Sequence, residues 1–247
     1  NQLPPPFGRP YFLREFDVEL HQIMRQAEGN PIIYLANEIL AGNELKPGVY
    51  GETQVIRKAQ LTDFCLRHAD VVLTSTNRLR GAINDLFRSS FYNYPDLECP
   101  HYGEKIICRR NDWGRFLKSK HGELYLTNGT CGTVDYVDKR SYTSKNVKID
   151  FKPDFSNHPF HNLKVDIAHL NAPLGQKNAT DTTWIAPDVD VFEYAYALTA
   201  YSAQGSQWDK TCVLQEDNYR MSEMDYMRLL YSSITRAAIS TTCVLPY

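Results

Sequence analysis

The pattern of apolar residues changes twice along the 247 residues of this chain, and that change limits the folds it can adopt. Residues 70–87 predict a buried strand followed by a helix, a unit typical of parallel sheets. From about residue 95 to 151, short segments with period-two alternation and frequent turns predict strands and no helix. The strand–helix pattern returns at residues 193–245. The sequence therefore predicts an α/β fold with a small β-barrel inserted between two α/β segments.

Local signals place the expected helices and strands. An Asn-Pro pair at residues 30–31 supplies a cap and a first-turn proline for a helix that ends at about Ala41. Ser222 resembles the start of a capping box for a helix that reaches about Ala237. Further helices are expected at 16–27 and from Asn77 to Phe87, and strands at 70–74, 105–108, 125–126, 134–137, 147–151, 193–199, 211–214 and 241–245. Turns are expected at Asn128-Gly129 and Cys131-Gly132, and residues 152–184 give no clear pattern.

Composition narrows the class of protein. The 27 basic and 29 acidic residues leave a net charge of −2, which does not indicate nucleic-acid binding. A local basic groove is still compatible with this net charge. The six cysteines are scattered without a C-x-x-C pair, which favours free thiols in a reducing compartment over disulfides or a zinc site. No apolar run approaches the roughly 18 to 20 residues of a membrane span. We therefore expect a soluble intracellular protein with no metal site and no membrane partner.

Four segments carry distinctive motifs. They are Gln2-Leu-Pro-Pro, the segment from His21 to Ile33, Leu-Thr-x-x-x-x-Gln-Gly-Ser-x-Trp ending at Trp208, and Tyr-x-x-Ile-Thr-Arg-Ala ending at Ala237. In this order, and over nearly the whole chain, they resemble the later motifs of superfamily 1 helicases in the RecD-like and phage Dda-like branch.

The resemblance implies a role for each matching residue. Gln2 would contact the γ-phosphate of ATP, and Arg25 and Arg236 would face the nucleotide; these three are the expected catalytic residues. Phosphoryl transfer needs such cations beside the charge that spreads over the γ-phosphate. Thr199 and Ser206 would contact the DNA backbone. The expected nucleotide-binding residues are Gln204, Gly205, Gln207 and Thr235.

Further candidates for nucleic-acid binding come from placement in the chain. Thr76, Asn77 and Arg78 follow a strand and begin a helix, where hydroxyls, N–H groups and a cation can bind a phosphate. An N-cap followed by a solvated helix face explains the same residues equally well. In the segment that resembles the SH3-like insertion of these helicases, Trp113 offers a stacking surface for a single strand. The neighbouring cations are Arg109, Arg110, Arg115, Lys118 and Lys120, for which a solvated rim is the alternative.

The chain also departs from the family pattern. The family's His-Lys pair is here Tyr201-Ser202, which removes a phosphate contact, and its glutamate is Gln207, which carries no charge. No G-x-x-x-x-G-K-[ST] segment occurs, so no loop cradles the α- and β-phosphates. Arg236 near a helix C-terminus also has a simpler explanation, because cations stabilise that end of a helix.

The resemblance implies a RecA-like (P-loop NTPase-type) parallel-sheet domain with an inserted SH3-like β-barrel. Residues 1–15 are the expected tail of a first motor domain, and residues 16–95 with 188–247 are the expected second RecA-like domain. Residues 96–187 are the expected insertion, with an irregular extension.

The function that follows is the C-terminal half of an ATP-dependent DNA helicase. It would bind single-stranded DNA and supply arginine fingers to ATP and Mg²⁺ held by an N-terminal RecA-like domain, and the branch implies 5′ to 3′ travel. The chain alone is expected to be inactive as an ATP hydrolase. Proteins of DNA replication, repair or recombination are the expected partners, in the cytoplasm of a bacterial or phage-infected cell. The alternative is a noncatalytic nucleic-acid-binding or regulatory module that kept the helicase fold.

Overall fold

The computed structural model describes residues 29–120, 122–143, 145–171, 185–216 and 221–246. These residues form two compact units. The discontinuous unit is made of the chain up to Thr76 and from Leu198 onward, and the contiguous unit runs from Asn77 to Ala197. Among the described residues, no helix combines the length and the apolar character that crossing a bilayer requires.

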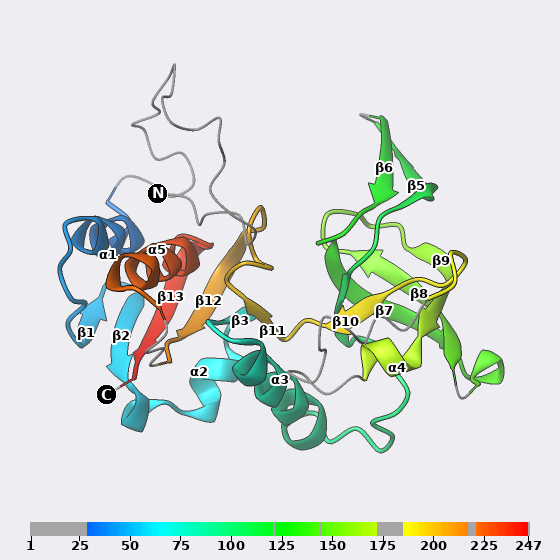
Figure 1. The fold of residues 1–247 in the computed structure, drawn as a ribbon, viewed down its shortest axis with the longest axis horizontal. Coiled ribbons are helices and arrows are strands. Elements are labelled where there is room, and N and C mark those ends of the chain that lie inside the picture. The colour runs from blue at the N-terminus through cyan, green and yellow to red at the C-terminus, as the bar shows by residue number, and fades with distance from the viewer. Residues whose placement is uncertain (1–28, 121, 144, 172–184, 217–220, 247) are drawn as a thin grey trace. The chain divides into compact units, whose positions relative to one another are not determined.

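The discontinuous unit is built on a six-stranded sheet, in which β2, β13, β12 and β3 are parallel and β1 is antiparallel to β2 (Figure 1). The sheet order is β1 (Gly48–Tyr50), β2 (Thr53–Arg57), β13 (Ala237–Leu245), β12 (Trp208–Leu214), β3 (Val71–Thr74) and β11 (Ala197–Thr199). All of β3 and the second half of β12, from Thr211 to Leu214, are buried, as expected of strands covered on both faces. The predicted α/β fold with a parallel sheet is confirmed.

Two capped helices pack against this sheet. α1 (Pro31–Leu40) begins where the Asn30 side chain accepts a hydrogen bond from the Ile32 N–H at 2.9 Å. α5 (Glu223–Ile234) begins where the Ser222 hydroxyl accepts from the Asp225 N–H at 3.1 Å. The two helices lie side by side and α1 also contacts β13 (Figure 1). The shorter η1 (Lys58–Gln60) and α2 (Asp63–Arg67) connect β2 to β3.

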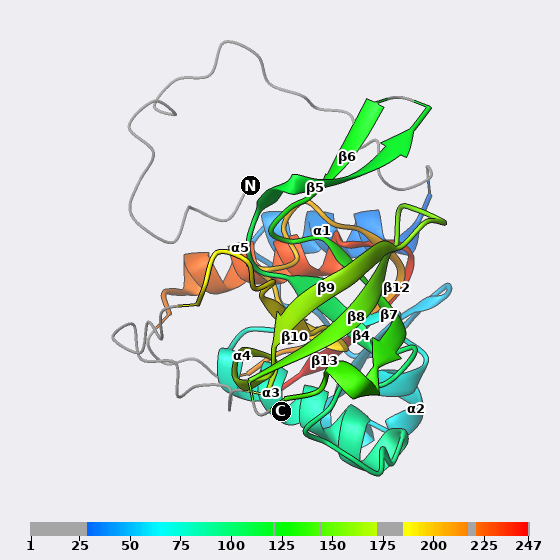
Figure 2. The same ribbon diagram turned by 90° about the vertical axis from the view of Figure 1, so that its right-hand side faces the viewer.

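The contiguous unit contains a five-stranded antiparallel sheet. Its order is β10 (Phe192–Tyr194), β4 (Lys105–Cys108), β7 (Cys131–Asp138), β8 (Asn146–Pro153) and β9 (Phe160–Asp166). A separate hairpin of β5 (Asp112–Ser119) and β6 (Gly122–Leu126) extends beyond this sheet as a two-stranded ribbon (Figures 1 and 2). The unit has its own core, in which Phe151, Phe192 and Leu163 are fully buried. That this unit is an SH3-like barrel stays a prediction, as do the domain boundaries at residues 95 and 188.

Helices flank the antiparallel sheet of the contiguous unit. α3 (Asn77–Leu86) continues into the π-helix η2 (Phe87–Phe91) before the chain enters β4. The short helices η3 (Lys139–Ser141) and α4 (Ile167–Leu170) follow β7 and β9.

Three local predictions are corrected. Cys131-Gly132 is the start of β7 and no turn, because Gly132 provides a close approach: a Cβ there would collide with the carbonyl oxygen of Lys152 on β8. The single strand predicted at 193–199 is divided into β10 and β11, which belong to different sheets. α5 ends at Ile234, and β13 begins at Ala237 instead of residue 241. No strand was predicted at β1, β2, β5 or β9, and the helix expected at 16–27 lies outside the described residues.

Candidate functional site

The loop between β11 and β12 begins with a turn closed by Thr199. The Thr199 hydroxyl donates to the Ser202 hydroxyl at 3.0 Å and accepts from the Ser202 N–H at 3.2 Å. The Thr199 carbonyl accepts from the Ala203 N–H at 3.0 Å. Thr199 is buried, so its hydroxyl shapes this loop.

The second half of the loop presents backbone to solvent. Gly205 has a φ of +88°, a conformation that favours glycine, and Gln204, Gly205 and Gln207 are exposed. The Ser206 N–H closes the turn by donating to the Ala203 carbonyl at 3.2 Å. A ligand can therefore approach the backbone at Gly205 without meeting a side chain there.

Arg236 joins this loop to the end of α5. Its Nε donates to the Ser232 carbonyl at 3.0 Å and its Nη1 donates to the Ser206 carbonyl at 3.3 Å. The Trp208 N–H donates in turn to the Arg236 carbonyl at 3.0 Å. Only 9% of Arg236 is exposed, so the guanidinium is held in one orientation beside the loop. The neighbouring Thr235 hydroxyl donates to the Tyr231 carbonyl at 2.8 Å.

A second polar group lies at the carboxyl ends of β3 and β12. The hydroxyl of Ser75 donates to Oε2 of Glu216 at 3.1 Å, and the hydroxyl of Thr76 donates to the same oxygen. Sites in open α/β sheets lie at such strand ends. Sequence reasoning missed Glu216, although it follows a buried strand as Thr76 does.

The remaining nucleic-acid candidates lie in the contiguous unit. Asn77 and Arg78 occupy the first turn of α3, and both side chains are exposed. Trp113 on β5 is 66% exposed and meets Tyr125 of β6 edge-on, with ring centroids 5.8 Å apart. Phe116 lies against the same Tyr125 ring. The hairpin thus carries three neighbouring aromatic rings, of which only Trp113 was predicted.

The cations predicted around Trp113 divide into two groups. Arg109 pairs with Glu193 at 2.7 Å, and Arg115 pairs with Asp112 and Asp190 at 3.2 and 3.4 Å. Arg110 donates to the Pro187 carbonyl at 2.9 Å. These three arginines stabilise the unit, whereas Lys118 and Lys120 are exposed on the hairpin or next to it.

Electrostatic effects on the hairpin are local. The Tyr125 hydroxyl donates to the Glu123 carboxylate, and this hydrogen bond raises the pKa of Tyr125 above its ordinary value.

Two of the predicted catalytic residues, Gln2 and Arg25, lie outside the described residues. Among the residues that the structure describes, no three His, Cys, Asp or Glu side chains are grouped as a metal site would require.

Comparison with known proteins identifies the segment that contains the loop and Arg236. Residues 194–241 match the sequence profile of the UvrD-like helicase C-terminal domain. A search of curated proteins found no match.

Similar solved structures are Pif1 helicases. The chain is similar to the Bacteroides Pif1 helicase in complex with ADP-AlF3 and ssDNA, at 13% identity over 91% of this chain and 51% of that chain, with a TM-score of 0.49. It is also similar to the Candida albicans Pif1 helicase, at 14% identity over 90% of this chain and 55% of that chain, with a TM-score of 0.45. The chain spans about half the length of these structures. The match over residues 194–241 is to the UvrD-like helicase C-terminal domain, which confirms the resemblance of this chain to superfamily 1 helicases.

Proposed function

We propose that this chain is the second RecA-like motor domain of an ATP-dependent DNA helicase of the RecD-like and Dda-like branch, with an SH3-like insertion. The observation that carries the proposal is the hydrogen bond from Arg236 Nη1 to the Ser206 carbonyl. This bond joins two segments, 30 residues apart, that were each predicted from separate motifs to face the nucleotide.

The chemistry of the proposed site is electrostatic. Phosphoryl transfer gains most from fixed cations beside the γ-phosphate, and a cation that is already oriented needs no reorganisation during the reaction. Arg236 has that property because two backbone carbonyls hold it. We propose that Arg25 and Gln2 complete the set, and that Gln204, Gly205, Gln207 and Thr235 contribute to the nucleotide contact. ATP and its Mg²⁺ would be held mainly by a first motor domain.

Single-stranded DNA is the proposed second ligand, with travel from 5′ to 3′. The proposed contacts to its backbone are Thr76, Asn77, Arg78, Thr199 and Ser206, and Trp113 would stack on a base. Exposure of Asn77, Arg78 and Trp113 supports this part of the proposal. Proteins of DNA replication or recombination in the cytoplasm of a bacterial or phage-infected cell are the proposed partners.

The experiment compares variants of a protein that includes both motor domains. Arg236→Ala should lower ATP hydrolysis stimulated by single-stranded DNA by about 10³ to 10⁵ while leaving DNA binding largely intact, as loss of an arginine finger does. Arg228→Ala, on the helix α5 that precedes Arg236 and partly exposed, is the control for removal of an arginine. A surviving rate in Arg236→Ala would refute the finger assignment.

A noncatalytic binding module is the second candidate. The family's lysine position is Ser202, whose hydroxyl carries no charge and accepts the Thr199 hydrogen bond. Tyr201, at the histidine position, is 39% exposed. This candidate expects binding of single-stranded DNA with no ATP hydrolysis in the protein that includes both motor domains.

A further inference from the structure

Helix α3 and its continuation η2 bury a row of polar side chains. Arg80, Asn84 and Arg88 are spaced four residues apart, so they lie on one face of the helix. Their exposed fractions are 4%, 2% and 5%. A helix normally buries apolar side chains on its inner face. We call these three residues the polar stripe.

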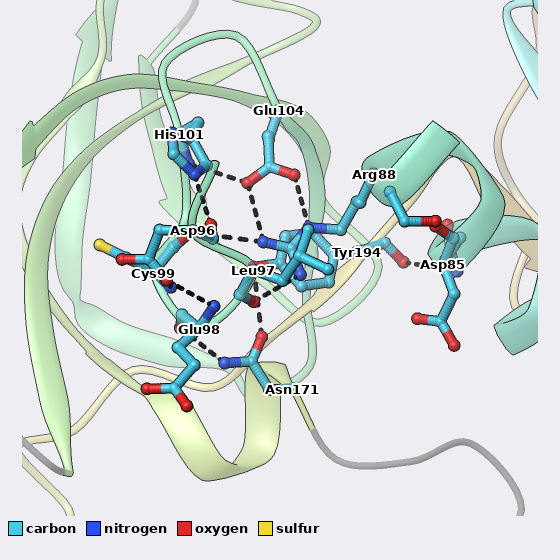
Figure 3. Close-up of polar contacts among 12 residues, drawn as sticks. Asp85, Arg88, Asp96, Leu97, Glu98, Cys99, His101, Glu104, Asn171 and Tyr194 are labelled. Atoms are coloured by element: carbon cyan, nitrogen blue, oxygen red, sulfur yellow. Dashed lines mark hydrogen bonds and ion pairs between the residues drawn. The ribbon is translucent and has the colours of Figure 1, made fainter. Parts of the chain in front are cut away.

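Arg88 ends the stripe in a dense set of contacts (Figure 3). Its Nε pairs with Glu104 at 2.6 Å, and its Nη1 donates to the Leu97 carbonyl at 2.8 Å. The guanidinium lies over the Tyr194 ring, 3.8 Å from the ring centroid. Arg88 therefore contacts both the loop before β4 and a residue of β10.

Arg80 begins the stripe and binds the neighbouring residue of β10. Its Nη1 pairs with Oε2 of Glu193 at 2.7 Å, and the same oxygen accepts from Arg109 Nε at 2.7 Å. The two arginines of the stripe thus hold Glu193 and Tyr194, which are consecutive in the chain.

Asn84, between them, holds the end of the same segment. Its Oδ1 accepts from the Ala197 N–H at 2.9 Å, and its Nδ2 donates to the carbonyls of Ala197 at 3.2 Å and Tyr194 at 3.3 Å. One amide group therefore satisfies both backbone groups of Ala197, as a neighbouring strand would. These bonds lie where the predicted strand at 193–199 divides into β10 and β11.

The polar stripe fixes the position of α3 against residues 193–197 more than it adds to the free energy of unfolding. Burying ion pairs carries a desolvation cost that can cancel their attraction, so such groups are weak contributors to stability. A helix shifted by one residue would break the hydrogen bonds and ion pairs to Glu193, Ala197 and Glu104 together. The stripe therefore allows one placement of α3 against residues 193–197.

We propose that Asn84 is a positioning residue for nucleic-acid binding. This inference rests on the function proposed above. The helix that Asn84 orients begins with Asn77 and Arg78, the exposed candidates for phosphate contact, and the segment that it holds ends two residues before Thr199. Asn84 touches no ligand itself; it sets the geometry in which its helix meets a phosphate.

The test measures how binding of an oligo(dT) strand by this chain depends on salt. For single strands the slope of log K against log salt becomes shallower by about 0.7 for each phosphate that the protein no longer neutralises. Arg78→Ala calibrates the removal of one phosphate-binding cation. Asn84→Ala removes no charge, yet we expect it to weaken binding about tenfold and to flatten the slope by a similar amount. Ser89→Ala, an exposed neutral change on the same helical segment, should alter neither.

The outcomes separate the two proposals. If the unaltered chain does not bind oligo(dT), the proposed function fails. If it binds, and Asn84→Ala either leaves binding unchanged or weakens it at an unchanged slope, the positioning role of Asn84 is refuted. Asn84→Gln keeps an uncharged amide, displaced by one methylene, and serves if Asn84→Ala does not fold; we expect an intermediate slope for it.

Discussion

The Glu216 carboxylate accepts hydrogen bonds from the hydroxyls of Ser75 and Thr76, and Thr76 is one of the proposed contacts to a DNA phosphate. A phosphate oxygen would need the same donors, and two like charges about 4 Å apart repel by about 1 kcal/mol even in water. We therefore expect Glu216 to compete with a phosphate for these hydroxyls.

The first prediction follows from this competition. Glu216→Gln keeps an acceptor oxygen and removes the charge, so the affinity of the chain for oligo(dT) at low salt should rise about fivefold, the equivalent of about 1 kcal/mol. Fluorescence anisotropy measures this directly. Glu223→Gln removes the same charge from an exposed position on α5. An equal gain in both variants would show an effect of net charge and none of the site.

The second prediction concerns the ion pair of Arg88 and Glu104. Burial raises the pKa of Glu104 above its ordinary value, although hydrogen bonds from Arg88 and the His101 N–H oppose this rise. In Arg88→Met the pKa rises further. The folded state then holds a proton that the unfolded chain has released, so the free energy of unfolding falls as pH increases above the ordinary pKa. We expect a loss of about 3 to 5 kcal/mol at pH 7 and a smaller loss at pH 5.

Chemical denaturation at the two pH values checks this prediction. The double variant Arg88→Met with Glu104→Gln has no carboxyl group to titrate at this position, so its free energy of unfolding should lose the pH dependence that Glu104 gives the single variant. Equal losses in the single variant at pH 5 and pH 7 would contradict the assignment to Glu104.

At the scale of helices and strands, a boundary is predicted correctly when the residues whose interaction sets it are close together in the sequence. Caps at Asn30 and Ser222 act within three residues, and they predict the starts of α1 and α5 correctly. At the break between β10 and β11 the Ala197 N–H donates to Asn84, 113 residues earlier in the chain, and no local pattern shows this contact. The turn predicted at Gly132 is wrong because a sequence does not reveal that another backbone lies against this glycine.

The same limit applies to the candidate site. The resemblance to helicase motifs predicts the loop residues and Arg236, and the structure brings Ser206 and Arg236 together. The sequence does not predict the contacts of Glu216, because its hydrogen-bond partners lie about 140 residues earlier in the chain.

The third prediction belongs to the β5–β6 hairpin. Stacking of a base on an exposed aromatic ring contributes about 1 to 3 kcal/mol, so Trp113→Ala should weaken binding of oligo(dT) by about fivefold or more. The salt dependence should stay the same because the substitution removes no cation from a phosphate. Tyr136→Ala, on β7 and 53% exposed, is the control for removal of a surface ring. Equal effects of the two variants would exclude a specific stacking platform.

At the scale of the whole molecule, the contiguous unit has the properties of an independent domain. Residues 77–197 contain a complete antiparallel sheet and a core of their own. The polar stripe binds α3 to residues of the same unit. A domain of about 120 residues is large enough to fold alone.

The fourth prediction is that residues 77–197, expressed separately, fold cooperatively. A single thermal transition with dispersed amide resonances would confirm it. Asn84→Ala in the same fragment should lower the melting temperature, because the backbone groups of Ala197 lose their partner. A fragment without a cooperative transition would show that this unit depends on the rest of the chain.

The parallel sheet also has a consequence for how the chain is made. β2 and β3 leave the ribosome before the contiguous unit, whereas their partners β13 and β12 are translated after it. The apolar residues of β3, Val71 to Leu73, therefore wait unpaired while more than a hundred further residues are synthesised. A nascent chain halted in that interval exposes strand edges that have no partner strand. We therefore expect the chain to be most prone to aggregation, and most dependent on chaperones, during this part of translation.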